Sequence, residues 1–145
     1  MKLKVKRLHP DAKLPTQATP GSACYDVYTL GKVTVWNGKV TRISCGLAFE
    51  VPEGYFIEIR PRSGLASKGL TIVNSPGTLD SDYRGELMIL MFNVSPDPHS
   101  LGYGIKKGDR IAQIRLVPVL DIEFEAVCEL DITERGAGGF GSTGK

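Results

Sequence analysis

Short segments with strand-like alternation run through most of the chain, and turn-forming residues separate each segment from the next. Leu3 and Val5 alternate with Lys2, Lys4 and Lys6, which describes one apolar and one solvated face. No segment sustains a 3.6-residue pattern, and residues 64–68 allow one helical turn at most. Further strand candidates, rich in Val, Ile, Phe and Tyr, are residues 33–36, 40–51, 55–59, 87–93, 110–120 and 122–127. Many short strands predict an all-β fold, a barrel or a jelly roll built from two sheets.

The length and charge of the chain narrow the classes of function. With 145 residues it suits a single domain. A net charge of +2, with both signs interspersed, is too small to indicate direct nucleic-acid binding by bulk electrostatics. The N-terminus lacks the apolar core of a signal peptide, and no apolar run reaches membrane-spanning length. We therefore expect a cytoplasmic protein with no membrane partner.

The cysteines indicate neither a disulfide framework nor a zinc site. Cys24, Cys45 and Cys128 are odd in number, widely scattered and contain no C-x-x-C pair. We expect them to be small core residues.

The last eleven residues, from Arg135 to Lys145, form a glycine-rich tail that nearly matches a phosphate-binding loop. Residues 139–145 fit the spacing G-x-x-x-x-G-K, but the chain stops where a helix should follow. Two interpretations remain open: an arm that becomes ordered on a phosphorylated ligand, or a flexible solubilising tail. Phe140 and Arg135 favour the arm, because flexible linkers rarely contain either residue type. This divides the chain into a barrel domain, residues 1–134, and a flexible phosphate-binding arm, residues 135–145.

Four other stretches place reactive side chains in turn-forming sequence. They are Pro20-Gly-Ser-Ala-Cys-Tyr-Asp26, Arg60-Pro-Arg-Ser-Gly-Leu-Ala-Ser-Lys68, Gly77-Thr-Leu-Asp-Ser-Asp-Tyr-Arg-Gly-Glu86 and Gly108-Asp-Arg-Ile-Ala-Gln113. Each is weak evidence alone, since a hairpin with Asp and Gly is usually just a turn and Asp109-Arg110 is more often a structural ion pair. Together with the tail, and in this order, they resemble the motifs of the trimeric dUTPase family.

The resemblance implies a jelly-roll-like β-barrel and a specific hydrolysis. In that family a water attacks the α-phosphorus of dUTP and releases dUMP and pyrophosphate, which limits uracil incorporation into DNA and supplies dUMP for thymidylate synthesis. Asp80 matches the base that orients and deprotonates this water, a role that contributes about 10²–10⁴ in rate. The other catalytic candidates match residues that stabilise charge on the phosphates; they are Ser63, Arg62 and Gln113.

The resemblance also implies the residues that bind the substrate. Tyr83 matches the ring that packs under the deoxyribose and leaves no room for a 2′-hydroxyl. Phe140 is expected to stack over uracil, which the hairpin reads largely through main-chain groups. The complete set of substrate-binding candidates is Asn74, Gly77, Leu79, Tyr83, Met88, Ser63, Lys68, Arg135, Phe140, Gly141, Ser142 and Thr143.

Family resemblance further implies Mg²⁺ and a homotrimer with shared active sites. The ion is expected to be held mainly by substrate phosphates and waters, with Asp26 contacting those waters. Cys24 stands where members usually have glycine. Two alternatives use the same fold. A nucleotide-responsive regulatory protein would be expected to lack Asp80, Ser63 or Phe140. A dCTP deaminase of the same superfamily would be expected to depart from the Asp80-x-x-Tyr83 hairpin.

Overall fold

The computed structural model describes residues 2–94 and 101–142, and almost every regular element in them is a β-strand. The one helix among these residues is a single turn, α1 (Ser63–Ala66). The strands in chain order are β1 (Lys4–Arg7), β2 (Thr16–Gln17), β3 (Tyr25–Tyr28), β4 (Val33–Trp36), β5 (Val40–Glu50), β6 (Tyr55–Arg60), β7 (Leu70–Ile72), β8 (Gly77–Leu79), β9 (Glu86–Asn93), β10 (Gly102–Ile105) and β11 (Arg110–Pro118). The prediction of an all-β, jelly-roll-like fold is confirmed.

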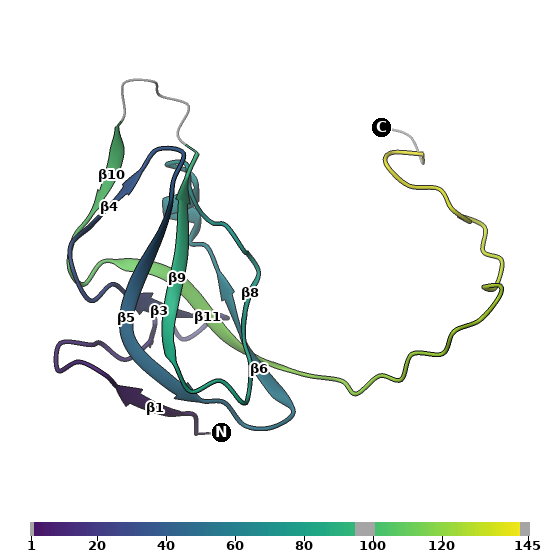
Figure 1. Ribbon diagram of the computed structural model, residues 1–145, viewed down its shortest axis with the longest axis horizontal. Coiled ribbons are helices and arrows are strands. Elements are labelled where there is room, and N and C mark those ends of the chain that lie inside the picture. Colours follow the sequence, from purple (N-terminus) through teal and green to yellow (C-terminus); the bar gives the residue numbers. More distant parts are fainter. Residues whose placement is uncertain (1, 95–100, 143–145) are drawn as a thin grey trace.

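Hydrogen bonds divide the described strands into three sheets rather than one closed barrel (Figure 1). One sheet has the order β1-β5-β9-β7, a second has β2-β3-β11-β6-β8, and the strands β10 and β4 form a third. All the strand pairs are antiparallel. Such an arrangement encloses apolar side chains between sheets while the outer faces meet solvent.

The core is built by strands in which every second residue is buried. In β9 the burial alternates along the whole strand, with Leu87, Ile89 and Met91 buried. These side chains belong to one hydrophobic cluster with Val27 of β3 and Ile111 of β11. Two sheets therefore share a single core, which holds their strand ends, and the side chains placed there, in fixed relative positions.

The long strand β5 contains a bulge that breaks its alternation. Its pairing register with β9 shifts between Ser44 and Ala48, and Gly46 adopts a φ of 67°. A β-carbon at residue 46 would lie 3.0 Å from Ala12 Cβ, so both backbone conformation and space favour glycine there. The bulge lies opposite the start of β9, directly after the predicted substrate hairpin.

After β11 the chain leaves the sheets, and the strand predicted at residues 122–127 is wrong. Residues 119–142 contain turns and bends but no strand or helix, and Figure 1 shows them running away from the body. Ile122 and Phe124 are 69% and 88% exposed. Strand-forming residues need a partner strand, and no strand in the described part of the chain pairs with this segment. The division predicted at residues 134 and 135 stays a prediction.

The structure also corrects the prediction for the cysteines. Cys45 is buried as expected, but Cys24 is only partly buried and Cys128 is exposed. Burial, with the carboxylate of Glu86 nearby, raises the pKa of the Cys45 thiol to about 12. Among the described residues, Phe140 is the one non-glycine residue with a left-handed φ, so Cys24 does not occupy a conformation reserved for glycine. No helix in the described part of the chain is long and apolar enough to cross a bilayer.

Candidate active site

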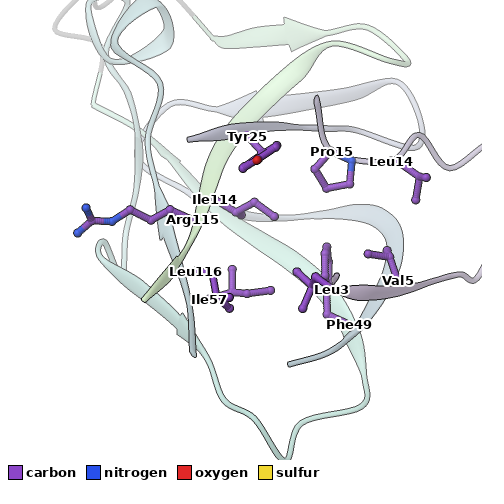
Figure 2. Close-up of a pocket in the computed structure, with 10 residues that line it drawn as sticks. All are labelled: Leu3, Val5, Leu14, Pro15, Tyr25, Phe49, Ile57, Ile114, Arg115 and Leu116. Carbon is purple, nitrogen blue, oxygen red and sulfur yellow. The ribbon is translucent and has the colours of Figure 1, made fainter. Parts of the chain in front are cut away.

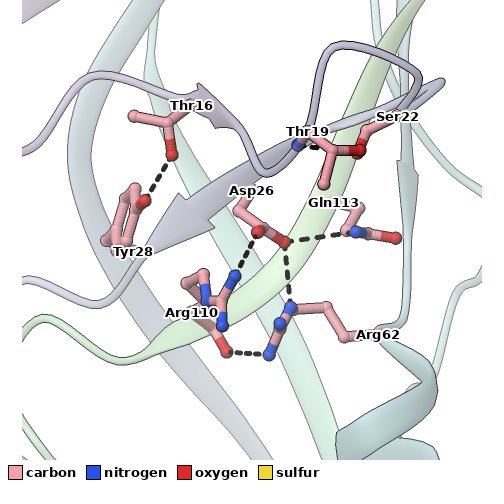
Figure 3. A network of polar contacts seen from close by, with 8 residues as sticks. All are labelled: Thr16, Thr19, Ser22, Asp26, Tyr28, Arg62, Arg110 and Gln113. Atoms are coloured by element: carbon pink, nitrogen blue, oxygen red, sulfur yellow. Dashed lines mark hydrogen bonds and ion pairs between the residues drawn. The ribbon is translucent and has the colours of Figure 1, made fainter.

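Asp26 is buried at the centre of a polar cluster on β3 (Figure 3). Its side chain is 2% exposed, and its Oδ1 accepts hydrogen bonds from Arg62 Nε at 2.9 Å and Gln113 Nε2 at 3.2 Å. Its Oδ2 pairs with Arg110 Nη1 at 3.0 Å. A buried carboxylate is stable only when paired in this way. Asp26 thus holds two guanidiniums and an amide in place at the surface of the sheet.

Three separate parts of the chain build this cluster. Asp26 lies opposite Gln113 in the β3–β11 register, although the sequence predicted turn-forming surroundings for Asp26. Arg62 is the residue before α1, and its Nη1 also donates to the Arg110 carbonyl oxygen at 3.2 Å. Ser63 is the first residue of α1 and is exposed. The structure therefore brings Arg62 and Gln113 together at Asp26, and Ser63 follows Arg62 directly in the chain; the catalytic roles of the three residues stay predictions.

Arg110 is a member of this cluster that sequence reasoning treated as structural. The ion pair expected between Asp109 and Arg110 is not formed: Asp109 Oδ2 accepts from the Lys106 main-chain N–H at 2.8 Å, while Arg110 turns to Asp26. The signal was present in the sequence, because Arg110 lies three residues before Gln113 in the same motif. A pocket of about 250 Å³ opens beside Arg62 and Arg110, against Tyr103.

The loop that joins β8 to β9 holds the second group of predicted residues. The two strands belong to different sheets, so the hairpin predicted from the sequence is a connection between sheets, and the name hairpin is kept for residues 80–85. Asp80 comes directly after β8 and is exposed, and its carbonyl oxygen accepts from the Tyr83 N–H at 3.3 Å. Arg84 Nη1 donates to the carbonyl oxygens of Ser81 at 2.6 Å and Tyr83 at 3.0 Å. Hydrogen bonds within the turn therefore stabilise it, and the Asp80 carboxylate and the half-exposed Tyr83 ring face solvent.

Other predicted residues surround this hairpin. Leu79 is buried, so its side chain belongs to the core and only its main chain faces the hairpin edge. Asn74 is exposed, with its Nδ2 so close to Gly77 that a β-carbon at residue 77 would lie 3.3 Å from it. Met88 is half-buried on the same face of β9 as Glu86. Strand β8 is the edge of its sheet, which leaves main-chain groups on one side without a neighbouring strand.

Within a single chain, the Asp80 hairpin and the Asp26 cluster lie apart. Strand β6 lies between β11 and β8 and so relates the two groups. Gln113 of β11 pairs with Arg60 of β6. Leu79 of β8 pairs with Ile57, so Asp80, the next residue, lies level with Phe56. Four residues along a strand span about 13 Å. Arg62 and Ser63 lie further along the chain in the direction away from Asp80. Among the described residues, no hydrogen bond or ion pair joins the hairpin to the Asp26 cluster.

The arm residues lie away from both groups. Arg135 Nε donates to the Gly138 carbonyl oxygen at 2.8 Å, a contact local to the arm, and Phe140 is fully exposed. Gly141 and Ser142 are also exposed. Thr143 lies outside the described residues. The ligand contacts proposed for Arg135, Phe140, Gly141, Ser142 and Thr143 therefore stay predictions.

Lys68 contacts an aromatic ring beside α1. Its Nζ lies 5.6 Å from the centre of the Tyr103 ring and donates to the Tyr103 hydroxyl at 3.2 Å. The side chain is exposed, so the charge stays available at the surface next to the 250 Å³ pocket that Tyr103 lines.

The residues present fit Mg²⁺ only as an ion carried by a ligand. Both oxygens of Asp26 are taken up by arginines and an amide, so direct coordination would break those contacts. Within residues 2–94 and 101–142, no group of three or more His, Cys, Asp or Glu side chains could hold a metal. A cation with phosphate oxygens and waters as its ligands needs no such group.

A second polar cluster lies on the same sheet. Arg115 donates to Glu58 from Nε at 3.0 Å and from Nη2 at 3.3 Å, across the β11–β6 register, and Arg60 also contacts Glu58. These hydrogen bonds hold the pKa of Glu58 below its ordinary value. Arg115 also lines an apolar pocket of about 510 Å³ (Figure 2). That pocket contains none of the predicted site residues, and its lining includes Leu3, Val5, Tyr25, Phe49 and Ile114.

Comparisons with known proteins agree with the motifs. A family model described as dUTPase matches residues 10–144. A deoxyuridine 5'-triphosphate nucleotidohydrolase of Nautilia profundicola is 49% identical over 146 residues, which cover 100% of both chains. One of the same name from Hydrogenobaculum sp. is 49% identical over 146 residues and 99% of both chains.

Solved structures give the same result. The dUTPase of Staphylococcus bacteriophage 80alpha, solved with dUPNHPP, superposes with a TM-score of 0.89 at 31% identity, covering 99% of both chains. The match extends over the barrel strands, the hairpin and nearly all of the arm. The chain belongs to the dUTPase family.

Proposed function

We propose that this protein is an enzyme that hydrolyses dUTP to dUMP and pyrophosphate. The observation that carries the proposal is the match to the dUTPase family over residues 10–144. The turn at Asp80–Tyr83 and the polar cluster around Asp26 support it. In the reaction, the oxygen of a water forms a bond to the α-phosphorus. The bond from that phosphorus to the bridging oxygen breaks, and pyrophosphate leaves.

Asp80 is the proposed base. It lies exposed at the end of an edge strand, where a carboxylate can accept a proton from the attacking water. The neighbouring turn is closed by Arg84, which supports a fixed direction for the Asp80 main chain. Pre-positioning of this kind is what makes a general base effective.

The same hairpin is proposed to recognise uracil and deoxyribose. The open edge of β8 offers main-chain donors and acceptors that can match the pairing edge of uracil, with Gly77, Leu79 and Asn74 beside it. Tyr83 presents its ring where the sugar would rest, and a filled volume there rejects a 2′-hydroxyl. Met88 borders this surface from β9.

The phosphates are proposed to bind at the Asp26 cluster and under the arm. Arg62, Ser63 and Gln113 share one face there, with Arg110 and Lys68 adding positive charge at the pocket beside Tyr103. Such donors stabilise charge on phosphoryl oxygens. Mg²⁺ held by the triphosphate would neutralise part of that charge, with Asp26 reached through water. The arm residues Arg135, Phe140, Gly141, Ser142 and Thr143 complete the site.

We propose that the active enzyme is a homotrimer, because one chain leaves its site incomplete. The distance along β6 between the Asp80 hairpin and Gln113 separates the base from the phosphate-binding groups of the same chain. The segment after β11 also leaves Leu120, Phe124 and Ile132 at least 81% exposed. Large apolar residues that are exposed along one segment are typical of a surface that a second chain covers.

In the cell, the proposed reaction limits incorporation of uracil into DNA and supplies dUMP for thymidylate synthesis. A cytoplasmic location is proposed with it, because the deoxynucleotides used in both processes are there. Direct binding to nucleic acid or to a membrane forms no part of the proposal.

The experiment is an assay of the full chain with dUTP, dTTP, dCTP and UTP separately, with Mg²⁺ present, measuring pyrophosphate and ammonia. We expect pyrophosphate from dUTP, far less from the other nucleotides, and almost none from Asp80→Asn. Ammonia from dCTP would instead indicate a deaminase. Nucleotide binding without turnover would indicate the regulatory alternative, and equal turnover of dTTP would refute the substrate assignment.

A further inference from the structure

Glu86, the first residue of β9, uses its carboxylate to hold the bulge of the neighbouring strand. Its Oε1 accepts from the Gly46 N–H at 2.7 Å and from the Ser44 hydroxyl. The two donors lie within the segment where the β5–β9 register shifts. A bulge leaves main-chain groups without their ladder partners, and the carboxylate takes the place of such a partner.

The bulge itself is anchored to the core. The Gly46 carbonyl oxygen accepts from the Leu8 N–H at 2.8 Å, and the Ser44 carbonyl oxygen accepts from the Leu30 N–H at 2.9 Å. Cys45, between these two residues, is buried. Glu86 is therefore attached through its side chain to a part of the molecule that is fixed from several sides.

The main chain of the same residue holds Tyr83. The Tyr83 hydroxyl donates to the Glu86 carbonyl oxygen at 3.1 Å. The ring lies so close over Gly85 that a β-carbon there would be 3.0 Å from Tyr83 Cε2 and closer still to the hydroxyl. The hydrogen bond and the absence of a side chain at residue 85 together set the position of the ring.

We propose that Glu86 is a positioning residue for sugar discrimination, which fixes Tyr83 by tying the end of the hairpin to the bulge of β5. The inference rests on the proposed function, because it assigns to Glu86 the orientation of the ring that excludes the 2′-hydroxyl. Its carboxylate fixes the backbone at residue 86, and its carbonyl oxygen then presents a fixed acceptor to Tyr83. Glu86 does not itself contact the substrate.

A purely structural role for Glu86 predicts a different result. Loss of the carboxylate would then lower stability and reduce turnover of dUTP and UTP alike. Loss of positioning changes their ratio, because a ring free to move no longer fills the volume of the 2′-hydroxyl. The ratio of kcat/KM for dUTP to kcat/KM for UTP, measured well below the unfolding temperature, separates the two roles.

The first part of the test uses the full-length chain and four single variants. Glu86→Ala should lower the dUTP/UTP ratio on the order of tenfold, which is part of the roughly 10²-fold by which an apolar pocket rejects an added hydroxyl. Glu86→Gln keeps an Oε1 acceptor and should stay within about twofold of the unmodified protein, since neutral hydrogen bonds are weaker than charge-assisted ones but keep the geometry. Ser44→Ala removes one donor and should give an intermediate ratio. Val35→Ala is the control for stability. Val35 is buried in β4, so this variant should lower stability as Glu86→Ala does and leave the dUTP/UTP ratio unchanged.

A double variant shows whether Glu86 acts through Tyr83. Tyr83→Ala should lower the ratio by itself, and Glu86→Ala added to it should cause no further fall, because coupled residues are not additive. An unchanged ratio in Glu86→Ala overturns the inference, as does a further fall in the double variant. If Glu86→Ala does not fold, an unchanged ratio in Ser44→Ala overturns it instead. An unchanged ratio in Tyr83→Ala refutes both the proposed role of Tyr83 and this inference. A lower ratio in Tyr83→Ala with an unchanged ratio in Glu86→Ala refutes only the role of Glu86.

Discussion

Asp26 and Arg62 form an ion pair of 2.9 Å across 36 positions of sequence, and the carboxylate in that pair is almost fully buried. The pair joins the middle of β3 to the residue that begins the helical turn carrying Ser63. Because Arg110 pairs with the other oxygen, one carboxylate holds two guanidiniums, and the three side chains together keep one net positive charge. The cluster therefore links the stability of the sheet to the placement of the proposed phosphate-binding groups.

Replacing Asp26 by Asn should lower both stability and activity. The amide keeps the size of the side chain but leaves Arg62 and Arg110 without their counter-charge, and we expect the free energy of unfolding to fall by about 1–3 kcal/mol. Urea denaturation measures this change, and kcat/KM for dUTP should fall with it. Asp109→Asn is the matched control, because Asp109 is exposed and, among the described residues, its side chain accepts a hydrogen bond from the Lys106 N–H and pairs with no guanidinium. Equal effects of the two variants would contradict this role of Asp26.

Asp80→Asn should remove activity and leave the fold unchanged. We expect kcat to fall by about 10²–10⁴, the contribution of a positioned base. Stability should stay within about 0.5 kcal/mol, since the carboxylate is exposed at a hairpin. Thermal unfolding and a pyrophosphate assay measure the two effects. Asp82→Asn, an exposed carboxylate two residues later, should retain most of the activity.

Glu58 should make stability depend on pH in the acid range. Hydrogen bonds from Arg115 hold its pKa below the ordinary value of 4.5 in the folded chain, so the ionised form stabilises the fold. This contribution is fully present above pH 4.5 and is lost as the pH falls through the lowered pKa. Glu58→Gln should therefore lower the urea midpoint at pH 7, and the difference from the unmodified chain should shrink on acidification.

Glu50→Gln provides the control for that titration. Glu50 also pairs with a cation, Lys4 at 2.7 Å, but its side chain is 51% exposed, against 12% for Glu58. Solvent weakens exposed pairs, so its effect on the midpoint should be smaller. A larger effect of Glu50→Gln, or a Glu58→Gln difference that grows at low pH, would refute the assignment.

Deleting residues 136–145 should abolish most turnover while leaving the fold and the assembly intact. The last main-chain contact of the chain end with the sheets is the Val119 N–H to the Gly54 carbonyl oxygen at 2.8 Å, well before the deletion. Size-exclusion chromatography, circular dichroism and the pyrophosphate assay measure the three properties. Loss of assembly in the truncated chain would mean that the arm is structural.

Alternation was sufficient to predict the long strands of this fold. Strand β9 carries apolar residues on a regular period and β5 alternates up to its bulge, so the positions of both strands follow from sequence. Strands β7 and β8 are three residues each, and Gly77 begins the second, so local sequence resembles a turn. Their strand geometry comes from pairing with β9 and β6, which no single segment reveals. Asp26 was placed in a turn for the same reason.

The motifs located the site residues but not the contacts between them. The role of Arg110 depends on the buried carboxylate of Asp26, 84 positions away. The contacts of Glu86 depend on a bulge in β5 that periodicity does not show. The strand expected at residues 122–127 has suitable residues, yet strand formation requires a partner edge, and the described part of the chain pairs none with it.

The departure of the chain from the sheets after Val119 gives the arm a long tether. Phe140 lies 21 positions after Val119, and at about 3.3 Å per extended residue this stretch spans up to about 70 Å. The arm thus acts as a tethered ligand, whose effective concentration at a site depends on how well the tether length matches the span. Shortening the tether within residues 120–133 would leave Asp80, Ser63, Arg62 and Gln113 in place. It would still change how often the Phe140 ring reaches the proposed uracil site.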